Sequence, residues 1–164
     1  VHDLVDIVSK NGNLLLNVGP KPDGTIPDEA SRLLLDLGAW LDVNAEAIYG
    51  AHHWHTFGEG STTVAEGHMR EREDKPFAAE DIRFTTKDDT LYAICLGWPG
   101  EFATIKSLGN SSPVKAGRIE QIQMLGSPES LAWSQDENAL QIRTPAQRPC
   151  DHAYTFRISL KHEG

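Results

Sequence analysis

The sequence predicts an α+β protein in which a helix–strand–helix unit over residues 1–50 precedes an antiparallel β-sandwich over residues 51–164. Two observations support this division. The first fifty residues combine helical periodicity with one uninterrupted apolar run, whereas the later residues form short segments separated by Gly, Pro, Ser and Asp. Many of these later segments alternate apolar and polar residues and are separated by turn residues, which is typical of a sandwich.

The first unit is predicted in chain order. A short amphipathic helix ends near Ser9, because Asn11-Gly12 tolerates the positive φ that terminates helices. Residues 13–18 (NLLLNV) are apolar without alternation, which is typical of a strand buried on both faces, as in parallel sheets and barrels. A Pro- and Gly-rich loop then leads to a helix that begins near Pro27. The apolar face of this helix is formed by Ala30, Leu33, Leu34, Leu37 and Leu41.

The second unit contains seven candidate strands. Asp88-Asp89 and Asp136-Glu137-Asn138 lie where hairpin turns are expected. In the last strand, four apolar side chains at alternate positions share one face. The predicted strands are Ile82 to Thr86, Thr90 to Trp98, Thr104 to Leu108, Ile119 to Leu125, Leu131 to Ser134, Ala139 to Arg143 and Tyr154 to Leu160.

Composition excludes several classes of protein. The formal net charge of −9 argues against nucleic acid as a partner, because phosphate binding needs a basic face. No apolar run approaches the roughly 20 residues that span a bilayer, so we expect a soluble protein with no membrane partner. Cys95 and Cys150 are too few for a disulfide framework and are predicted to be free thiols, with Cys95 buried. The start at Val1, without Met or a signal-like stretch, indicates a chain cut from a longer one, and the compartment is not predicted.

Residues 4–27 (LVDIVSKNGNLLLNVGPKPDGTIP) strongly resemble the segment that ends the catalytic (β/α) TIM-like barrel of glycoside hydrolase family 29 α-L-fucosidases. The resemblance continues through LGAWL at 37–41 and NAEAIYG at 44–50, and extends into the sandwich at 82–87, 91–94 and 97–99. It therefore implies the last helix–strand–helix of the barrel, followed by the family's C-terminal sandwich.

The resemblance implies retaining hydrolysis of terminal α-L-fucosides by two carboxyl groups about 5 Å apart. In the family these carboxylates lie on segments before the one that opens this chain, so no catalytic residue is carried over. The expected partners are fucosylated glycans or aryl fucosides, and neither a metal nor another cofactor is implied. The alternative function is a non-catalytic module that binds carbohydrate or stabilises the barrel.

The carboxyl ends of barrel strands face the active site, which makes Asn17 and Lys21 candidates for lying near the sugar. Their other possible role is to close the loop onto the following helix. Trp54 is a further candidate because its ring can stack on a sugar face or cover the junction between barrel and sandwich. A site rebuilt within this chain would draw on a carboxylate and imidazole set consisting of Asp23, His53, His55 and Glu59.

His52-His53-Trp54-His55 is also a potential metal site, since residues 53 and 55 share one face of a strand. No third ligand is fixed by spacing, so exposed imidazoles on a sandwich edge are the favoured interpretation. Trp98 and Trp133 are interpreted first as sandwich core or rim, with carbohydrate binding as the alternative.

An isolated barrel strand would expose unpaired backbone groups beside the apolar stripe of the next helix. Exposed edges of this kind pair with other chains. The sequence therefore predicts a homo-oligomer formed through the strand at residues 13–18 and the helix that follows.

Overall fold

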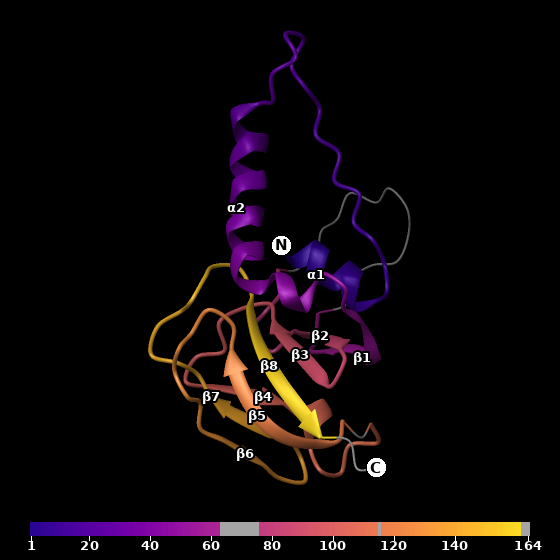
Figure 1. Cartoon of the computed structure of the whole chain (residues 1–164), viewed down its shortest axis with the longest axis vertical. Helices are drawn as coiled ribbons and strands as arrows, with labels where there is room; N and C mark the ends of the chain where they lie inside the picture. The colour runs from indigo at the N-terminus through magenta and orange to yellow at the C-terminus, as the bar shows by residue number, and fades with distance from the viewer. Residues whose placement is uncertain (63–75, 115, 162–164) are drawn as a thin grey trace.

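The computed structural model describes residues 1–62, 76–114 and 116–161. Its described elements form three layers: a helical layer, a five-stranded sheet and a three-stranded sheet (Figure 1). The helical layer consists of α1 (His2–Ser9), α2 (Asp28–Asn44) and the 3-10 turn η1 (Ala45–Ala47). The predicted α+β class with an antiparallel sandwich is confirmed.

The two sheets are entirely antiparallel among the described strands. The larger has the order β1-β2-β3-β8-β5 and consists of β1 (His52–Glu59), β2 (Ile82–Lys87), β3 (Thr90–Cys95), β8 (Tyr154–Lys161) and β5 (Arg118–Met124). The smaller has the order β4-β7-β6 and consists of β4 (Phe102–Ile105), β7 (Leu140–Arg143) and β6 (Trp133–Gln135). Both edge strands of the larger sheet pair irregularly, with register shifts between His53 and Gly58 in β1 and between Ile119 and Gln121 in β5.

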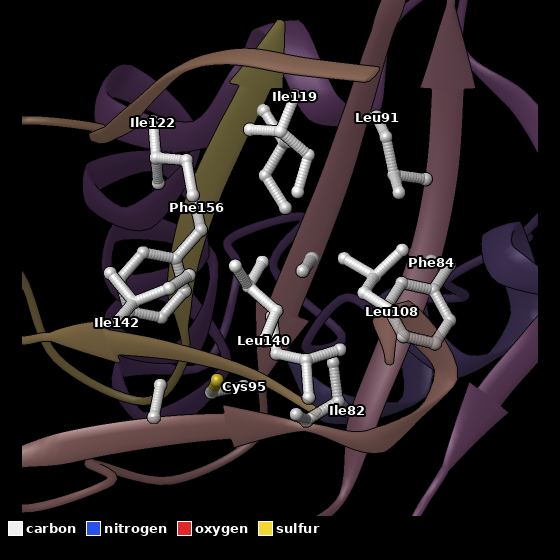
Figure 2. Packing of buried hydrophobic residues seen from close by; sticks show 14 of the residues in the cluster. Ile82, Phe84, Leu91, Cys95, Leu108, Ile119, Ile122, Leu140, Ile142 and Phe156 are labelled. Atoms are coloured by element: carbon white, nitrogen blue, oxygen red, sulfur yellow. The ribbon is translucent and has the colours of Figure 1, made fainter. Parts of the chain in front are cut away.

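The main hydrophobic core lies between the two sheets. Figure 2 shows Phe84 and Phe156 from the larger sheet and Leu140 and Ile142 from the smaller sheet in the same packed layer. Cys95 is buried in this core as a free thiol, as predicted, and its burial raises the pKa of the thiol to about 12.

A second core fills the space between the larger sheet and the helical layer. Val5 of α1 and Trp40 of α2 pack with Tyr92 and Ile94 of β3. The indole Nε1 of Trp40 donates a hydrogen bond of 2.9 Å to the carbonyl oxygen of Ala153. Because β3 is covered on both faces, residues 91–95 are all buried and the strand does not alternate.

Most of the predicted sandwich strands are found close to their expected positions. Three of them differ in extent, and the one predicted over Leu131 to Ser134 is found as the shorter β6 at Trp133–Gln135. The strand predicted over Thr90 to Trp98 ends at Cys95, where the chain turns toward β4. The strand predicted over Thr104 to Leu108 is divided into β4 and a 3-10 turn, η2 (Lys106–Leu108), whose first backbone N–H groups are hydrogen-bonded by a side chain from β1.

The buried strand predicted over residues 13–18 is not formed. No strand is assigned there, no described strand pairs with the segment, and Leu15 is 93% exposed. A doubly buried strand needs hydrogen-bonding neighbours and covering helices, and the described part of this chain supplies neither. Figure 1 shows the connection between α1 and α2 extending past the N-terminal end of α2, away from the sandwich.

Asp81 fixes the segment that enters β2. Its carboxylate accepts hydrogen bonds from the N–H and hydroxyl groups of Thr62 at 3.0 and 2.7 Å and from the N–H of Ala78 at 2.7 Å. Gly60, at φ 125°, leaves room for this carboxylate, because a Cβ there would collide with it. Burial raises the pKa of Asp81, but the hydrogen bonds from Ala78 and Thr62 and the nearby Arg83 guanidinium outweigh it, so the net pKa is lowered.

Because the folded-state pKa of Asp81 is depressed, its ionised carboxylate contributes stability above the unfolded pKa of about 4, and this contribution is lost as pH falls below that value. We expect Asp81→Asn to be less stable than the parent at pH 7 and to lose less stability on acidification. Urea denaturation between about pH 7 and pH 3 measures this difference. Identical pH dependence in Asp81→Asn and the parent would contradict the assignment.

Candidate functional site

Strand β1 carries four of the predicted site residues. The Trp54 side chain points into the core, is 7% exposed and packs edge-on against Phe84 with ring centroids 5.1 Å apart. His53 and His55 are exposed, and the Nδ1 atom of His53 lies 3.1 Å from the carbonyl oxygen of Trp54. The strand therefore presents imidazoles outward and anchors itself through Trp54.

Trp54 and His55 do meet at a cleft, with a volume of about 720 Å³, where one end of the sandwich opens between the two sheets. Its apolar lining includes Leu108 and Leu160, and its polar lining includes Asp88 and Arg118. The cleft lining thus combines one predicted imidazole with two charged side chains that the sequence did not single out as site residues.

Glu59, the fourth of these residues, is engaged in a structural contact. Its Oε1 accepts a 2.8 Å hydrogen bond from the N–H of Lys106, and its Oε2 accepts a 2.6 Å hydrogen bond from the N–H of Ser107. These N–H groups begin η2, where the turn itself offers them no carbonyl partner. The carboxylate therefore caps a turn between the sheets with both oxygens.

The remaining candidates lie on the connection between α1 and α2. Asp23 accepts hydrogen bonds from the N–H and hydroxyl groups of Thr25 at 3.0 and 2.7 Å. The hydrogen bond from the Thr25 hydroxyl, with that from its N–H, lowers the pKa of Asp23. Asn17 is exposed, and Lys21 forms a long ion pair of 4.0 Å with Asp28 at the start of α2.

The structure does not bring the four candidate catalytic residues together. Asp23 lies on the loop at the far end of α2, whereas His53, His55 and Glu59 lie on β1 beside the sandwich (Figure 1). Within residues 1–62, 76–114 and 116–161, no three His, Cys, Asp or Glu side chains are placed to hold a metal ion. In the same ranges no helix is long and apolar enough to cross a bilayer.

The sequence analysis missed a buried ion pair at the junction of α1 and the sandwich. The Nε of Arg83, on β2, donates a 2.6 Å hydrogen bond to Oδ1 of Asp6 on α1, and Lys10 Nζ lies 2.7 Å from Oδ2. The guanidinium also lies 5.4 Å from the ring of Phe57 and 5.3 Å from that of Phe77. The sequence offered one signal for this pair, namely the acidic Asp6 among the apolar positions of α1. Its partner, Arg83, lies 77 residues later in the chain.

The two sandwich tryptophans singled out by the sequence have different surroundings. Trp98 packs against the main core and meets the ring of Tyr154 edge-on at 4.9 Å. The guanidinium of Arg148 lies 5.3 Å from the centre of the Trp98 ring. Trp133 is exposed on β6. Trp98 is thus a core-to-rim residue and Trp133 a rim residue.

A helical layer attached to a two-sheet antiparallel sandwich defines the class of fold, and comparison with known proteins gives the family. A model described as "Alpha-L-fucosidase" matches residues 1–46, and one described as "Alpha-L-fucosidase C-terminal domain" matches residues 74–159. The second match covers more than half of the chain. The chain belongs to the α-L-fucosidase family.

Similar sequences and solved structures carry the same family name. The chain is 33% identical to the tissue α-L-fucosidase of Mus musculus and 31% identical to the plasma α-L-fucosidase of Homo sapiens, in each case over 97% of this chain and 31% of the relative. The crystal structure of Thermotoga maritima α-fucosidase superimposes with a TM-score of 0.71 at 33% identity, over 96% of this chain and 33% of that protein. The chain thus spans about a third of the length of these relatives.

Proposed function

We propose that this chain serves retaining hydrolysis of terminal α-L-fucosides as the part that closes and supports a catalytic barrel, and that it does not supply the catalytic carboxylates. The observation that carries the proposal is the pair of family matches, one to the enzyme family over residues 1–46 and one to its C-terminal domain over residues 74–159. The relatives are named as α-L-fucosidases, and the Thermotoga maritima enzyme has been solved in complex with fucose and with a mechanism-based inhibitor.

The surroundings of two candidate carboxyl groups, those of Asp23 and Glu59, support the proposal that this chain does not supply the catalytic carboxylates. A retaining glycosidase needs two carboxyl groups about 5 Å apart, one of them an acid with a raised pKa. Asp23 has a lowered pKa, and both oxygens of Glu59 are already hydrogen-bonded to backbone N–H groups. Neither carboxyl group has the surroundings that this acid requires.

The exposed apolar side chains support a role in closing a barrel. They lie on the connection between α1 and α2 and on the first half of α2, and their side chains are 46–93% exposed. Apolar side chains gathered in this way mark surfaces that other protein covers. The set consists of Leu15, Leu16, Ile26, Leu33 and Leu35.

Hydrolysis of 4-nitrophenyl α-L-fucoside tests the proposal. We expect the purified 164-residue chain to release no nitrophenol above the background of the expression host. A chimera in which this chain replaces the matching third of Thermotoga maritima α-fucosidase should hydrolyse the substrate, and that enzyme without its matching third should not. A folded but inactive chimera would contradict the supporting role.

Turnover by the chain alone that co-elutes with it on size exclusion would contradict the absence of catalytic groups. In that case Asp23, His53, His55 and Glu59 would be changed singly to Ala or Gln to find the site. The predicted homo-oligomer through residues 13–18 and α2 remains a prediction. Light scattering tests it directly, because a monodisperse monomer across the micromolar range would exclude it.

A further inference from the structure

We propose that the sandwich carries a binding cleft for a neutral saccharide, with Trp98 as its aromatic wall. The cleft has a volume of about 660 Å³, within the range of small-ligand sites. Three chain segments that are distant in sequence form it: residues 98–101 after β3, residues 129–132 before β6, and residues 143–146 at the end of β7.

The walls of this cleft are joined to one another by hydrogen bonds. The N–H of Thr144 donates to the carbonyl oxygen of Glu101 at 3.0 Å, and its hydroxyl donates to that of Gly100 at 2.6 Å. The N–H of Ala146 donates to the carboxylate of Glu129 at 3.1 and 3.2 Å. The three segments therefore hold a preformed shape, which reduces the entropy lost when a ligand is bound.

Trp98 is held in place from the core side. Its ring meets Tyr154 edge-on, and it packs against the apolar cluster between the sheets, yet the side chain remains half-buried and lines the cleft. Leu131 and Pro145 add further apolar surface. Such a wall suits the C–H face of a pyranose ring, which is apolar although its rim is polar.

The polar lining indicates which class of ligand fits. The carboxylates of Glu101 and Glu129 accept hydrogen bonds from hydroxyl groups, and the guanidinium of Arg143 donates them. Arg143 Nη2 lies 3.7 Å from Glu101 Oε1 in an exposed pair, so both groups can turn toward a ligand at little cost. Among the lining residues two carboxylates stand against one guanidinium, which disfavours a phosphate or sulfate, and the second guanidinium near this wall, that of Arg148, lies against the Trp98 ring 5.3 Å from its centre. A neutral polyhydroxylated ring can donate to the carboxylates and accept from the guanidinium.

The experiment is a titration of the ¹⁵N-labelled chain with a neutral fucosylated trisaccharide, a non-fucosylated neutral disaccharide and a sulfated disaccharide. The choice of a fucosylated probe rests on the proposed function. The readout is binding and not hydrolysis, so absence of binding would not contradict the proposed function, and failure of the hydrolysis tests would not contradict the binding cleft. We expect saturable shifts of the Trp98 indole N–H and of the Thr144 and Ala146 amides. The indole signal of Trp133, which lies outside the cleft lining, is the internal reference.

Glu101→Ala and Arg143→Ala should each weaken binding of the neutral probe by about tenfold, because each removes a charged hydrogen-bond partner. Both side chains are mostly exposed, so thermal unfolding should match the parent. Lys161→Ala, which removes another exposed ion pair away from the cleft, should bind as the parent does. Absence of saturable shifts at the cleft, unchanged affinity in both variants, or preference for the sulfated sugar would overturn the proposal.

Discussion

Asp6→Ala should destabilise the protein by about 3–5 kcal/mol, because it leaves a buried guanidinium without its carboxylate. The Arg83 side chain is 3% exposed, and its Nε lies 2.6 Å from Asp6 Oδ1. The two phenylalanine rings near the guanidinium offer cation–π attraction but accept no ionic hydrogen bond in place of the carboxylate. This pair also connects α1 to β2, so its loss should loosen the helical layer first.

Urea denaturation gives the free energy of unfolding for this test, with the m-value checked for constancy. Lys161→Ala, which removes an exposed ion pair with Glu120 at 3.9 Å, is the matched control and should cost less than about 1 kcal/mol. The double variant Asp6→Leu with Arg83→Met should recover part of the loss, since it leaves no buried charge at these two positions. A cost of Asp6→Ala equal to that of Lys161→Ala would show that the pair is not effectively buried.

Trp40→Ala should have an effect of similar size, about 3–5 kcal/mol, because it removes the largest side chain of the helix-facing core. Trp40 is 2% exposed and packs with residues of α1 and β3. Its indole also satisfies the carbonyl oxygen of Ala153. Removing the ring creates a cavity and leaves a buried acceptor without its donor.

Two further variants separate these contributions. Trp40→Phe keeps much of the packing and removes the hydrogen bond, so a smaller loss is expected. Leu33→Ala, on the same helix but at a side chain 65% exposed, should stay within about 0.5 kcal/mol of the parent. Thermal unfolding followed by near-ultraviolet circular dichroism measures all three. Equal losses for Trp40→Ala and Leu33→Ala would contradict the anchoring of α2 through its C-terminal end.

Local patterns were sufficient to predict much of the sandwich. β8 was predicted well because Tyr154, Phe156, Ile158 and Leu160 alternate and all enter the core between the sheets. The turn between β2 and β3 was predicted from Asp88-Asp89, and Asp88 indeed has a positive φ of 51°. Such signals lie within a few residues of one another, so no tertiary contact is needed to interpret them.

The errors arose where burial depends on distant parts of a protein. Residues 13–18 have the composition of a doubly buried strand, but composition does not supply the neighbours that bury it. The division of β4 from η2 depends on Glu59, whose carboxylate accepts hydrogen bonds from a turn that begins 47 residues later in the chain. The Asp6–Arg83 pair was missed for the same reason.

The candidate site was predicted only in part. The sequence identified Trp54 and His55, which line one cleft, but it grouped His55 with Asp23, which lies on the loop before the N-terminal end of α2. Their residue types suggested a common role in catalysis. In the structure, however, the carboxylates of Asp23 and Glu59 accept hydrogen bonds from backbone N–H groups. Trp98 was interpreted as sandwich core or rim, and it packs against the main core while half-buried, but the loops opposite it could not be placed from sequence.

The irregular edges of the larger sheet bear on how the sandwich behaves at high concentration. Its edge strands are β1 and β5, and both carry register shifts that bend the backbone away from a regular ladder. A bent edge is a poor template for a strand from another molecule, and proteins use such irregularities to avoid growing into fibrils. The sandwich is therefore protected against sheet extension from these edges, while the exposed leucines near α2 remain open to other contacts.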